Sequence, residues 1–243
     1  MTAVCGYRRP GSLDEALLLL SWPGTVVLGG GTRLAADPAP GPVQVVDLQA
    51  LGLGRIEAAD GGRLRIGATA TLQQIADSAV VPAVVREAAR RERPSTLRAQ
   101  ATLGGCVAAR EANSELLAAL LAYDAVLKIA GGPTHIALAE FLAGHPPPGA
   151  WIIAGLTVET SGTAFAARAG RTPADRPIVA AVARAGEDGE RRLALAGVAA
   201  APILVPGLAA TAELDPPGDF RGCGEYRRAV AAVLAARALE AIS

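Results

Sequence analysis

The sequence predicts a mixed fold of helices and strands, divided between two domains. Short apolar runs end in glycine-rich loops, and segments with helix caps and helical periodicity lie between them. A proline cluster, Pro146-Pro-Pro-Gly149, interrupts the chain between these two patterns. The 243 residues are enough for two modest hydrophobic cores. We therefore expect one domain over residues 1–158 and a second over 161–243.

The N-terminal segment predicts a helix, a strand, a loop and a second strand. A helix is expected over 13–20, with Ser12 as its N-cap, and a buried strand over 25–28. The glycines at 29–31 form the loop after this strand, and prolines then interrupt the chain before the strand predicted over 43–48.

The middle of the chain predicts a hairpin followed by three helices. The alternating residues 63–66 follow a turn at 60–62, as in a β-hairpin. One helix is expected over 71–76, capped by Thr71, and another over 84–91. Residues 116–123 are apolar enough for an internal helix.

The C-terminal part predicts strands and one long helix. Strands are expected over 151–158, 178–182 and 192–195, with a turn over 197–202. A helix is expected over 226–241, and its apolar face is expected to pack on a sheet. The side chains predicted on that face are Tyr226, Val230, Val233 and Leu234.

Two glycine clusters indicate a site for a phosphate-bearing ligand. In Thr102-Leu-Gly-Gly105 the adjacent glycines let backbone N–H groups approach a ligand, and the threonine hydroxyl is a donor. The loop at 29–31 follows a strand and offers a second nest of the same size. The second cluster also precedes a helix, whose dipole favours anions at its N-terminus. Two such loops suit a diphosphate dinucleotide.

The composition argues against several other classes of protein. Lys+Arg and Asp+Glu both number 23, so no basic field is present to hold nucleic acid or an anionic membrane. Cys5, Cys106 and Cys223 are too widely spaced for a disulfide framework, an iron–sulfur cluster or a zinc site. His135 and His145 have no further ligands at metal-binding spacing and are expected on the surface.

A cytoplasmic protein without membrane insertion is therefore expected, because a reducing compartment suits the cysteine pattern and the N-terminus lacks the apolar stretch of a signal peptide. No catalytic triad and no metal site are predicted. Cys106 is interpreted as a small residue that fills the tight turn, with a reactive thiol as the alternative.

A Rossmann site is the main competing interpretation of the first loop. Asp47 ends the next strand, eighteen residues after Gly29, where an acid that binds ribose would stand. The fingerprint, however, needs a glycine where Leu34 stands, and it needs a full helix in a segment that carries three prolines. The Rossmann interpretation is therefore disfavoured.

In this order, the motifs resemble those of the FAD-binding medium subunit of the molybdenum hydroxylases, the group of carbon monoxide dehydrogenase and xanthine dehydrogenase. The resemblance runs nearly from end to end. It rests on Tyr7-Arg-Arg-Pro-Gly-Ser-Leu-Asp-Glu-Ala16, Gly29-Gly-Gly-Thr-Arg-Leu34, Leu64-Arg-Ile-Gly-Ala-Thr-Ala-Thr-Leu72, Ala101-Thr-Leu-Gly-Gly105, Arg171-Thr-Pro-Ala-Asp-Arg-Pro-Ile178, Ala196-Gly-Val-Ala-Ala-Ala-Pro202 and Glu225-Tyr-Arg-Arg228.

The resemblance implies an α+β fold of the vanillyl-alcohol oxidase/PCMH type, with an FAD-binding domain of two lobes, 1–53 and 54–158, and a C-terminal α+β domain of a sheet with packed helices. It implies FAD in this chain, and [2Fe-2S] clusters and the molybdenum cofactor in a small and a large partner subunit. The complex is then an oxidoreductase heterotrimer, with or without dimerisation, in which FAD passes electrons on to NAD⁺, a quinone or another acceptor.

The resemblance also assigns the cofactor-binding residues. These are Leu28, Gly29, Gly30, Gly31, Thr32, Arg33, Leu34, Thr102, Gly104, Gly105, Cys106 and Glu115. Three of them depart from the family pattern: Glu115 stands where an aspartate is usual, Cys106 replaces an asparagine, and Arg33 stands where an acid is frequent.

Two alternatives follow from these departures and from the fold. The first is a flavin-free structural subunit of the same complex. The second is a free-standing FAD oxidoreductase, against which stands the lack of a substrate base or nucleophile near the loops.

Overall fold

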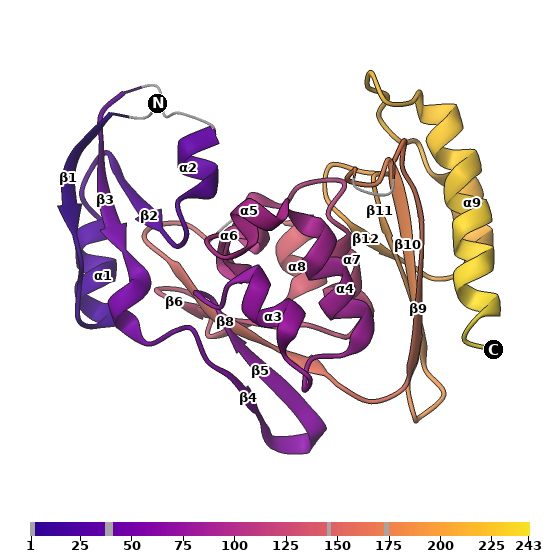
Figure 1. The fold of residues 1–243 in the computed structure, drawn as a ribbon, viewed down its shortest axis with the longest axis horizontal. Helices are drawn as coiled ribbons and strands as arrows, with labels where there is room; N and C mark the ends of the chain where they lie inside the picture. Colours follow the sequence, from indigo (N-terminus) through magenta and orange to yellow (C-terminus); the bar gives the residue numbers. More distant parts are fainter. Residues whose placement is uncertain (1–2, 37–40, 145–146, 173–174) are drawn as a thin grey trace.

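A computed structural model describes residues 3–36, 41–144, 147–172 and 175–243. Three sheets follow one another along the long axis of the molecule, with a layer of helices in its middle and one long helix at the end opposite the N-terminal lobe (Figure 1). His145 and Pro146, which the sequence analysis considered, lie outside the described residues.

The N-terminal lobe holds a three-stranded parallel sheet in the order β1-β3-β2. Its elements are β1 (Val4–Arg8), α1 (Leu13–Leu20), β2 (Thr25–Leu28), α2 (Thr32–Ala36), β3 (Val43–Asp47) and the 3-10 turn η1 (Leu48–Leu51). The Ser12 side chain accepts from the backbone of Glu15 at the start of α1, which confirms the predicted cap. The sequence predicted α1, β2 and β3 but neither β1 nor α2.

A five-stranded antiparallel sheet in the order β4-β5-β8-β6-β7 forms the base of the middle layer. Its strands are β4 (Ile56–Ala58), β5 (Arg63–Gly67), β6 (Val126–Ala130), β7 (His135–Ala137) and β8 (Ile152–Glu159), with the turn η2 (Asp60–Gly62) between β4 and β5. Alternate residues such as Leu64, Ile66 and Leu127 are buried beneath the helices. Arg65 and Lys128 lie on the opposite, exposed face of the sheet.

The helices that cover this sheet are α3 (Leu72–Asp77), α4 (Ala83–Glu92), α5 (Ser95–Arg98), α6 (Leu103–Ala109), α7 (Glu115–Ala122) and α8 (Leu138–Ala143). Thr71 and Gln74 close a full capping box on α3, so a purely local signal predicted this helix. Every residue of α7 is buried, which confirms the predicted internal helix.

The third sheet is antiparallel, in the order β12-β11-β10-β9, and packs between α7 and the last helix. Its elements are β9 (Thr163–Ala169), β10 (Val179–Ala185), β11 (Arg191–Ala196), β12 (Ile203–Val205), the turn η3 (Leu208–Glu213) and α9 (Gly224–Glu240). The predicted strands at 178–182 and 192–195 and the terminal helix are confirmed, whereas β9 and β12 were not predicted.

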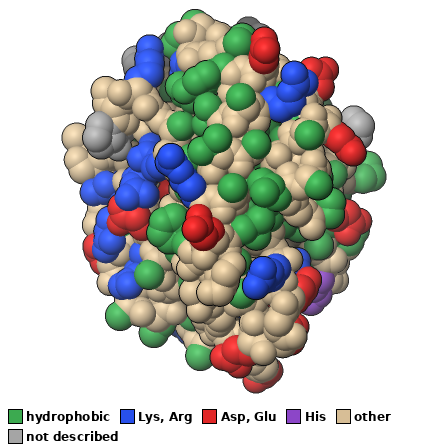
Figure 2. Space-filling model, turned by 90° about the vertical axis from the view of Figure 1, so that its right-hand side faces the viewer, with side chains coloured by type: hydrophobic (Ala, Val, Ile, Leu, Met, Phe, Trp, Pro, Cys, Tyr) green, Lys and Arg blue, Asp and Glu red, His purple; other side chains and the backbone are tan. Residues whose placement is uncertain are grey.

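The predicted packing face of α9 is wrong in part. Leu234 is buried, but Tyr226 and Val233 are 44% and 51% exposed. The face against the sheet carries mostly alanines, because small side chains let the helix approach the sheet closely. The buried members of this face are Arg227, Ala231, Leu234, Ala235 and Ala238. In Figure 2, which views this side of the molecule, hydrophobic side chains gather near the middle of the face, with charged ones around them.

Candidate cofactor-binding site

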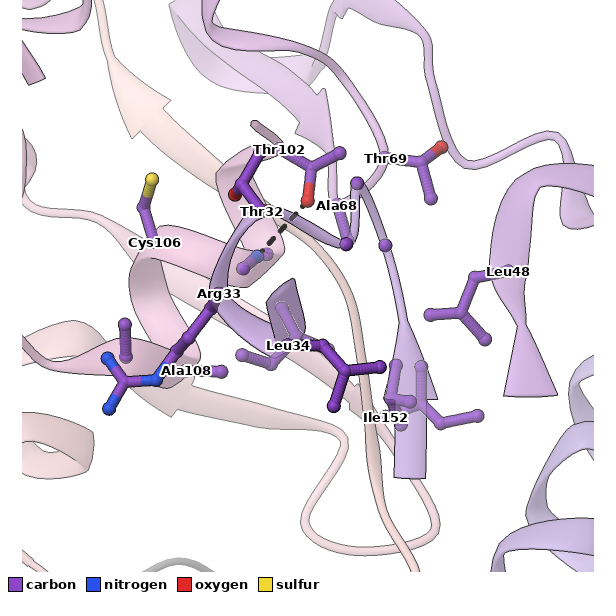
Figure 3. Close-up of a pocket in the computed structure, with 18 of the residues that line it drawn as sticks. Thr32, Arg33, Leu34, Leu48, Ala68, Thr69, Thr102, Cys106, Ala108 and Ile152 are labelled. Atoms are coloured by element: carbon purple, nitrogen blue, oxygen red, sulfur yellow. Dashed lines mark hydrogen bonds between the residues drawn. The ribbon is translucent and has the colours of Figure 1, made fainter. Parts of the chain in front are cut away.

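A cavity of about 540 Å³ lies where the N-terminal lobe meets the middle layer. The loop after β2, the first turns of α6 and the chain from Gly149 to Ile153 form its walls (Figure 3). Its volume is within the range of sites for cofactors and other small molecules. Of the residues assigned from the resemblance, all but Leu28 and Glu115 line it.

The two glycine loops meet at this cavity, a convergence that the sequence alone left open. A Cβ atom on Gly30 would lie 1.6 Å from the backbone oxygen of Gln100. One on Gly29 would lie 2.7 Å from the Thr102 hydroxyl oxygen, also too close for atoms that are not bonded. Glycine is therefore required at both positions so that the loops can touch.

The first loop offers unpaired backbone donors to the cavity. In the described part of the chain, the N–H groups of Gly29, Gly30, Gly31 and Thr32 have no protein acceptor. Gly31 has a φ of +73°, a conformation that favours glycine. Successive N–H groups in such a loop form a concave donor site for an anionic oxygen.

The second loop does not offer a matching set of unpaired backbone N–H groups, although a phosphate nest was predicted there. Thr102 is the N-cap of α6, and its side chain accepts from the Gly105 N–H at 3.3 Å. The N–H of Gly104 donates to Ala68 at 2.8 Å, the dashed line of Figure 3, and the N–H of Leu103 donates to Ala70 at 2.9 Å. These amides serve the packing of the helix start against the sheet.

The side chain of Gln49 orients the first loop, a role that no pattern in the sequence predicts. Its Nε2 donates to the carbonyl oxygen of Gly29 at 2.8 Å. Because a trans peptide is planar, the N–H of Gly30 must point away from Gln49, which itself does not line the cavity.

Asp47 in turn fixes Gln49. Its Oδ1 accepts from the Gln49 backbone at 2.9 Å, and its Oδ2 accepts from the Tyr7 hydroxyl. The Asp47 carboxylate, which a Rossmann site would use to bind ribose, is thus 5% exposed and serves as the N-cap of η1. Its bond to Tyr7 also raises the pKa of that phenol.

Two arginines add positive charge to the cavity wall. Arg33 was expected at the site. Arg93 belongs to the arginine-rich stretch 86–98, for which a solvated helix face was the favoured interpretation and a contact with a partner subunit or a cofactor phosphate the alternative. Both pair with Glu111, at 3.6 Å from Arg33 and 2.5 Å from Arg93.

Glu115 lies elsewhere, although the resemblance assigned it to the cofactor. It is the first residue of α7, is 2% exposed, and pairs with Arg91 at 3.2 Å and Arg168 at 3.3 Å. Since Arg168 belongs to β9, the carboxylate connects the middle layer to the third sheet. The aspartate-to-glutamate departure thus concerns an ion-pair network in the protein interior.

A second buried carboxylate, Glu92, forms a similar connection. It pairs with Arg176 and accepts from the Ser114 hydroxyl at 3.0 Å. Burial raises the pKa of Glu92, and the positive charge of Arg176 opposes this shift. Arg176 also pairs with Glu111, the partner of Arg33 and Arg93. One network of ion pairs therefore runs from the cavity wall to Arg176, shortly before the third sheet's strand β10.

Cys106 lines the cavity but is 6% exposed. Burial raises the pKa of its thiol to about 12, so the thiol stays protonated near neutral pH. This agrees with the interpretation of a small residue that fills the turn and not with a nucleophile.

Other types of site are not found in the part of the chain that the structure describes. His135 is exposed, and no group of three residues with His, Cys, Asp or Glu side chains is placed to hold a metal ion. None of the described helices is both long and apolar enough to cross a membrane.

Comparison with known proteins places this chain in a family. A family model described as the FAD binding domain in molybdopterin dehydrogenase matches residues 3–153. The uncharacterized protein YgfM of Escherichia coli strain K12 is 32% identical over 246 residues, which cover 95% of this chain and 93% of that protein.

Solved structures share the fold over the whole chain. Carbon monoxide dehydrogenase of Hydrogenophaga pseudoflava aligns with a TM-score of 0.89 and 21% identity, covering 100% of this chain and 98% of that one. Quinoline 2-oxidoreductase of Pseudomonas putida 86 aligns with a TM-score of 0.82 and 22% identity, covering 98% and 96%. These alignments confirm the predicted α+β fold. With the family match over more than half of the chain, they show that this protein belongs to the family that carries the FAD-binding domain of the molybdopterin dehydrogenases.

Proposed function

We propose that this chain is the electron-transfer subunit of a molybdenum hydroxylase complex and binds FAD in the cavity between its glycine loops. A small partner subunit with [2Fe-2S] clusters donates the electrons, and a large partner subunit carries the molybdenum cofactor. When bound, FAD supplies the exchange between single electrons and electron pairs that connects such clusters to NAD⁺, a quinone or another acceptor.

The observation that carries the proposal is the row of unpaired N–H groups from Gly29 to Thr32 on the wall of a 540 Å³ cavity. Backbone donors of this kind suit the oxygens of a diphosphate. The guanidinium groups of Arg33 and Arg93 place positive charge on the same wall. These residues fit a dinucleotide cofactor that carries negative charge, and their backbone contacts do not depend on side-chain identity.

The roles of the loops differ under this proposal. The first loop, 28–34, binds the phosphates, and Gln49 keeps the Gly30 amide turned away from itself. The second loop supplies a close wall through Thr102, Gly104 and Gly105, whose own amides are paired with protein atoms. Cys106 contributes apolar volume to this wall.

The division into domains is part of the proposal. Residues 1–158 contain both glycine loops, and residues 161–243 contain the third sheet and α9. The two parts are connected by the packing of α7 against β10 and β11 and by the buried carboxylates on α4 and α7. We assign the first part to cofactor binding and the second to the positioning of the subunit in a cytoplasmic heterotrimer, which can also form a dimer of heterotrimers.

The test is flavin content and flavin binding of the full chain, purified after co-expression with its partner subunits. We expect a flavin absorption band and close to one FAD per chain after heat release. Ala108 is exposed on α6 and lines the cavity, so Ala108→Trp should fill the site without entering the core and should abolish the band. Ala229→Trp, on the exposed side of α9, is the matched control and should retain it.

A flavin-free structural subunit is the second candidate, and two observations favour it. Glu115 is committed to ion pairs outside the cavity, and the second loop offers paired amides. In that case the co-expressed complex assembles, but the chain remains colourless and takes up no FAD when it is mixed with the cofactor. The same result would remove the proposal of electron transfer.

A further inference from the structure

A second cavity, of about 250 Å³, lies on the exposed face of the five-stranded sheet. In the described part of the chain, no residue lines both this cavity and the one between the glycine loops. The family's cofactor therefore does not account for it, and the inference drawn from it does not rest on the proposed function.

The register of the strands explains why the sheet is hollow at this point. Gly67, Gly155, Lys128 and His135 form one row across β5, β8, β6 and β7. The next row on the same face holds Glu57, Arg65, Thr157 and Val126. Two neighbouring glycines in the first row leave the backbone of the sheet uncovered by side chains.

The segment that leads into β4 forms one wall of this cavity. A Cβ atom on Gly67 would lie 2.1 Å from the Leu53 oxygen, so glycine is required for the close approach of this segment. The Gly67 N–H donates to the Arg55 oxygen at 2.8 Å, which extends the β4–β5 register by one residue and places Arg55 beside Gly67 in the first row. Arg55 and Lys128 thus lie on opposite sides of the Gly155 floor.

The charges in this cavity are predominantly positive. Arg65 pairs with Glu57 at 3.1 Å. The side chains of Arg55, Lys128 and His135 line the cavity and are exposed, and none of them has a hydrogen bond or ion pair with another described residue. Lys128 is the only lysine of the sequence. Two cations without protein partners, beside an open backbone floor, form a site for a compact anion.

The cavity also has an apolar side. Leu13 from α1, Leu53 and Val126 contribute to its lining. A purely inorganic ion would leave this surface exposed, whereas an organic group on the anion would bury it. The volume limits the ligand to a small molecule.

We propose that this cavity binds a small phosphate monoester, with its phosphate between Arg55 and Lys128 and its organic group against Leu13 and Val126. A phosphate monoester concentrates nearly two negative charges on one group near neutral pH, which matches two unpaired cations. A dicarboxylate spreads the same charge over two groups and fits this arrangement less well.

The test is isothermal titration of the full chain at low salt with phenyl phosphate, inorganic phosphate and succinate. We expect one phenyl phosphate per chain, and binding at least about fivefold weaker for the other two anions. Arg55→Gln and Lys128→Gln should each weaken phenyl phosphate binding about tenfold, because each removes one charged donor. Arg237→Gln, an exposed arginine on α9, should leave it unchanged.

Binding of phenyl phosphate should persist in the Ala108→Trp variant, which separates this site from the flavin cavity. Three results overturn the proposal: no measurable binding of phenyl phosphate, equal losses in the Arg237→Gln control, or tighter binding of succinate. A colourless protein that nevertheless binds phenyl phosphate supports this site and counts only against the flavin.

Discussion

Gln49 illustrates how one exposed side chain can determine the geometry of a loop. Its hydrogen bond to the Gly29 oxygen fixes one peptide plane, and with it the direction of the Gly30 N–H. No motif marks it, because amide-to-carbonyl contacts across the fold leave no pattern in the sequence. Arg93 belongs to an arginine-rich stretch whose favoured interpretation was a solvated helix face, and the sequence does not show which of its arginines reaches the cavity. Thr102, by contrast, was identified, but its hydroxyl faces its own helix as a cap.

Replacing Gln49 with leucine should weaken FAD binding about fivefold to tenfold, the effect of losing one hydrogen bond that orients a donor. The melting temperature should change little, because the side chain is exposed. Titration of apo-protein with FAD, followed by fluorescence, measures the effect. Gln73→Leu is a matched control, since Gln73 also donates a side-chain hydrogen bond, but to Asp77 at 2.7 Å and not to the first loop. Equal affinities in the two variants would contradict the role of Gln49.

At the scale of single elements, a cap beside an apolar run predicted three helices, but a cap alone was not sufficient, since α6 is also capped, by Thr102. Ser12 and Thr71 each mark a predicted helix start that the structure confirms, and Ser114 caps the helix that the apolar run over 116–123 predicts. The helix α6 was missed, because the two glycines in its first turn predict a loop. The strand β9 was missed as well, because its alanine-rich sequence carries no alternation and its pairing with β10 defines it.

Arg110 connects two helices at this scale. It follows α6 with a φ of +50°, and its guanidinium donates to carbonyl groups of Phe141, Leu142 and Gly144 at the C-terminal end of α8. A cation there satisfies orphan carbonyl groups and complements the helix dipole.

Arg110→Ala should lower the free energy of unfolding by about 2–4 kcal/mol through the lost charged hydrogen bonds, because arginine and alanine carry the same left-handed strain at this φ. Arg110→Gly should cost about 1 kcal/mol less, since glycine tolerates the same φ. Urea denaturation of both variants separates the two contributions. If the alanine variant is as stable as the wild type, the carbonyl contacts contribute nothing.

At the scale of the whole molecule, buried ion pairs connect the middle layer to the third sheet. Arg176 and Arg168 come from the chain after residue 161, and their partners Glu92 and Glu115 come from α4 and α7. The sequence could not predict these pairs, because 84 residues separate Glu92 from Arg176 and no periodicity relates them. The ion pairs of Glu115 were thus not predicted, and the resemblance alone assigned this residue to the cofactor.

Arg176→Ala should lower the free energy of unfolding by about 3–5 kcal/mol at neutral pH, because it leaves Glu92 buried without its cation. Burial already raises the pKa of Glu92, and loss of Arg176 raises it further. The folded variant then binds a proton more readily than its unfolded state, so its stability should fall as the pH rises from about 5 to 8.

Urea denaturation at both pH values measures this slope. The double variant Arg176→Ala/Glu92→Gln should lose the added pH dependence, because the glutamine has no proton to release. Arg171→Ala, whose side chain is 59% exposed on the same segment, should behave like the wild type. A slope in Arg176→Ala no steeper than that of the wild type would contradict this account.

The contact between the two glycine loops also gives a reason for the glycine motifs to be kept during evolution, independent of flavin binding. Gly29 and Gly30 are required by the backbone and side chain of residues 100–102, and Gly104 by Ala68, whether or not a ligand is bound. Selection for correct packing between the lobes and within the second lobe is thus enough to preserve these glycines. A descendant that had lost its flavin would keep both motifs, whereas the inward-facing residues of the cavity, such as Ala108, would be free to grow and fill it.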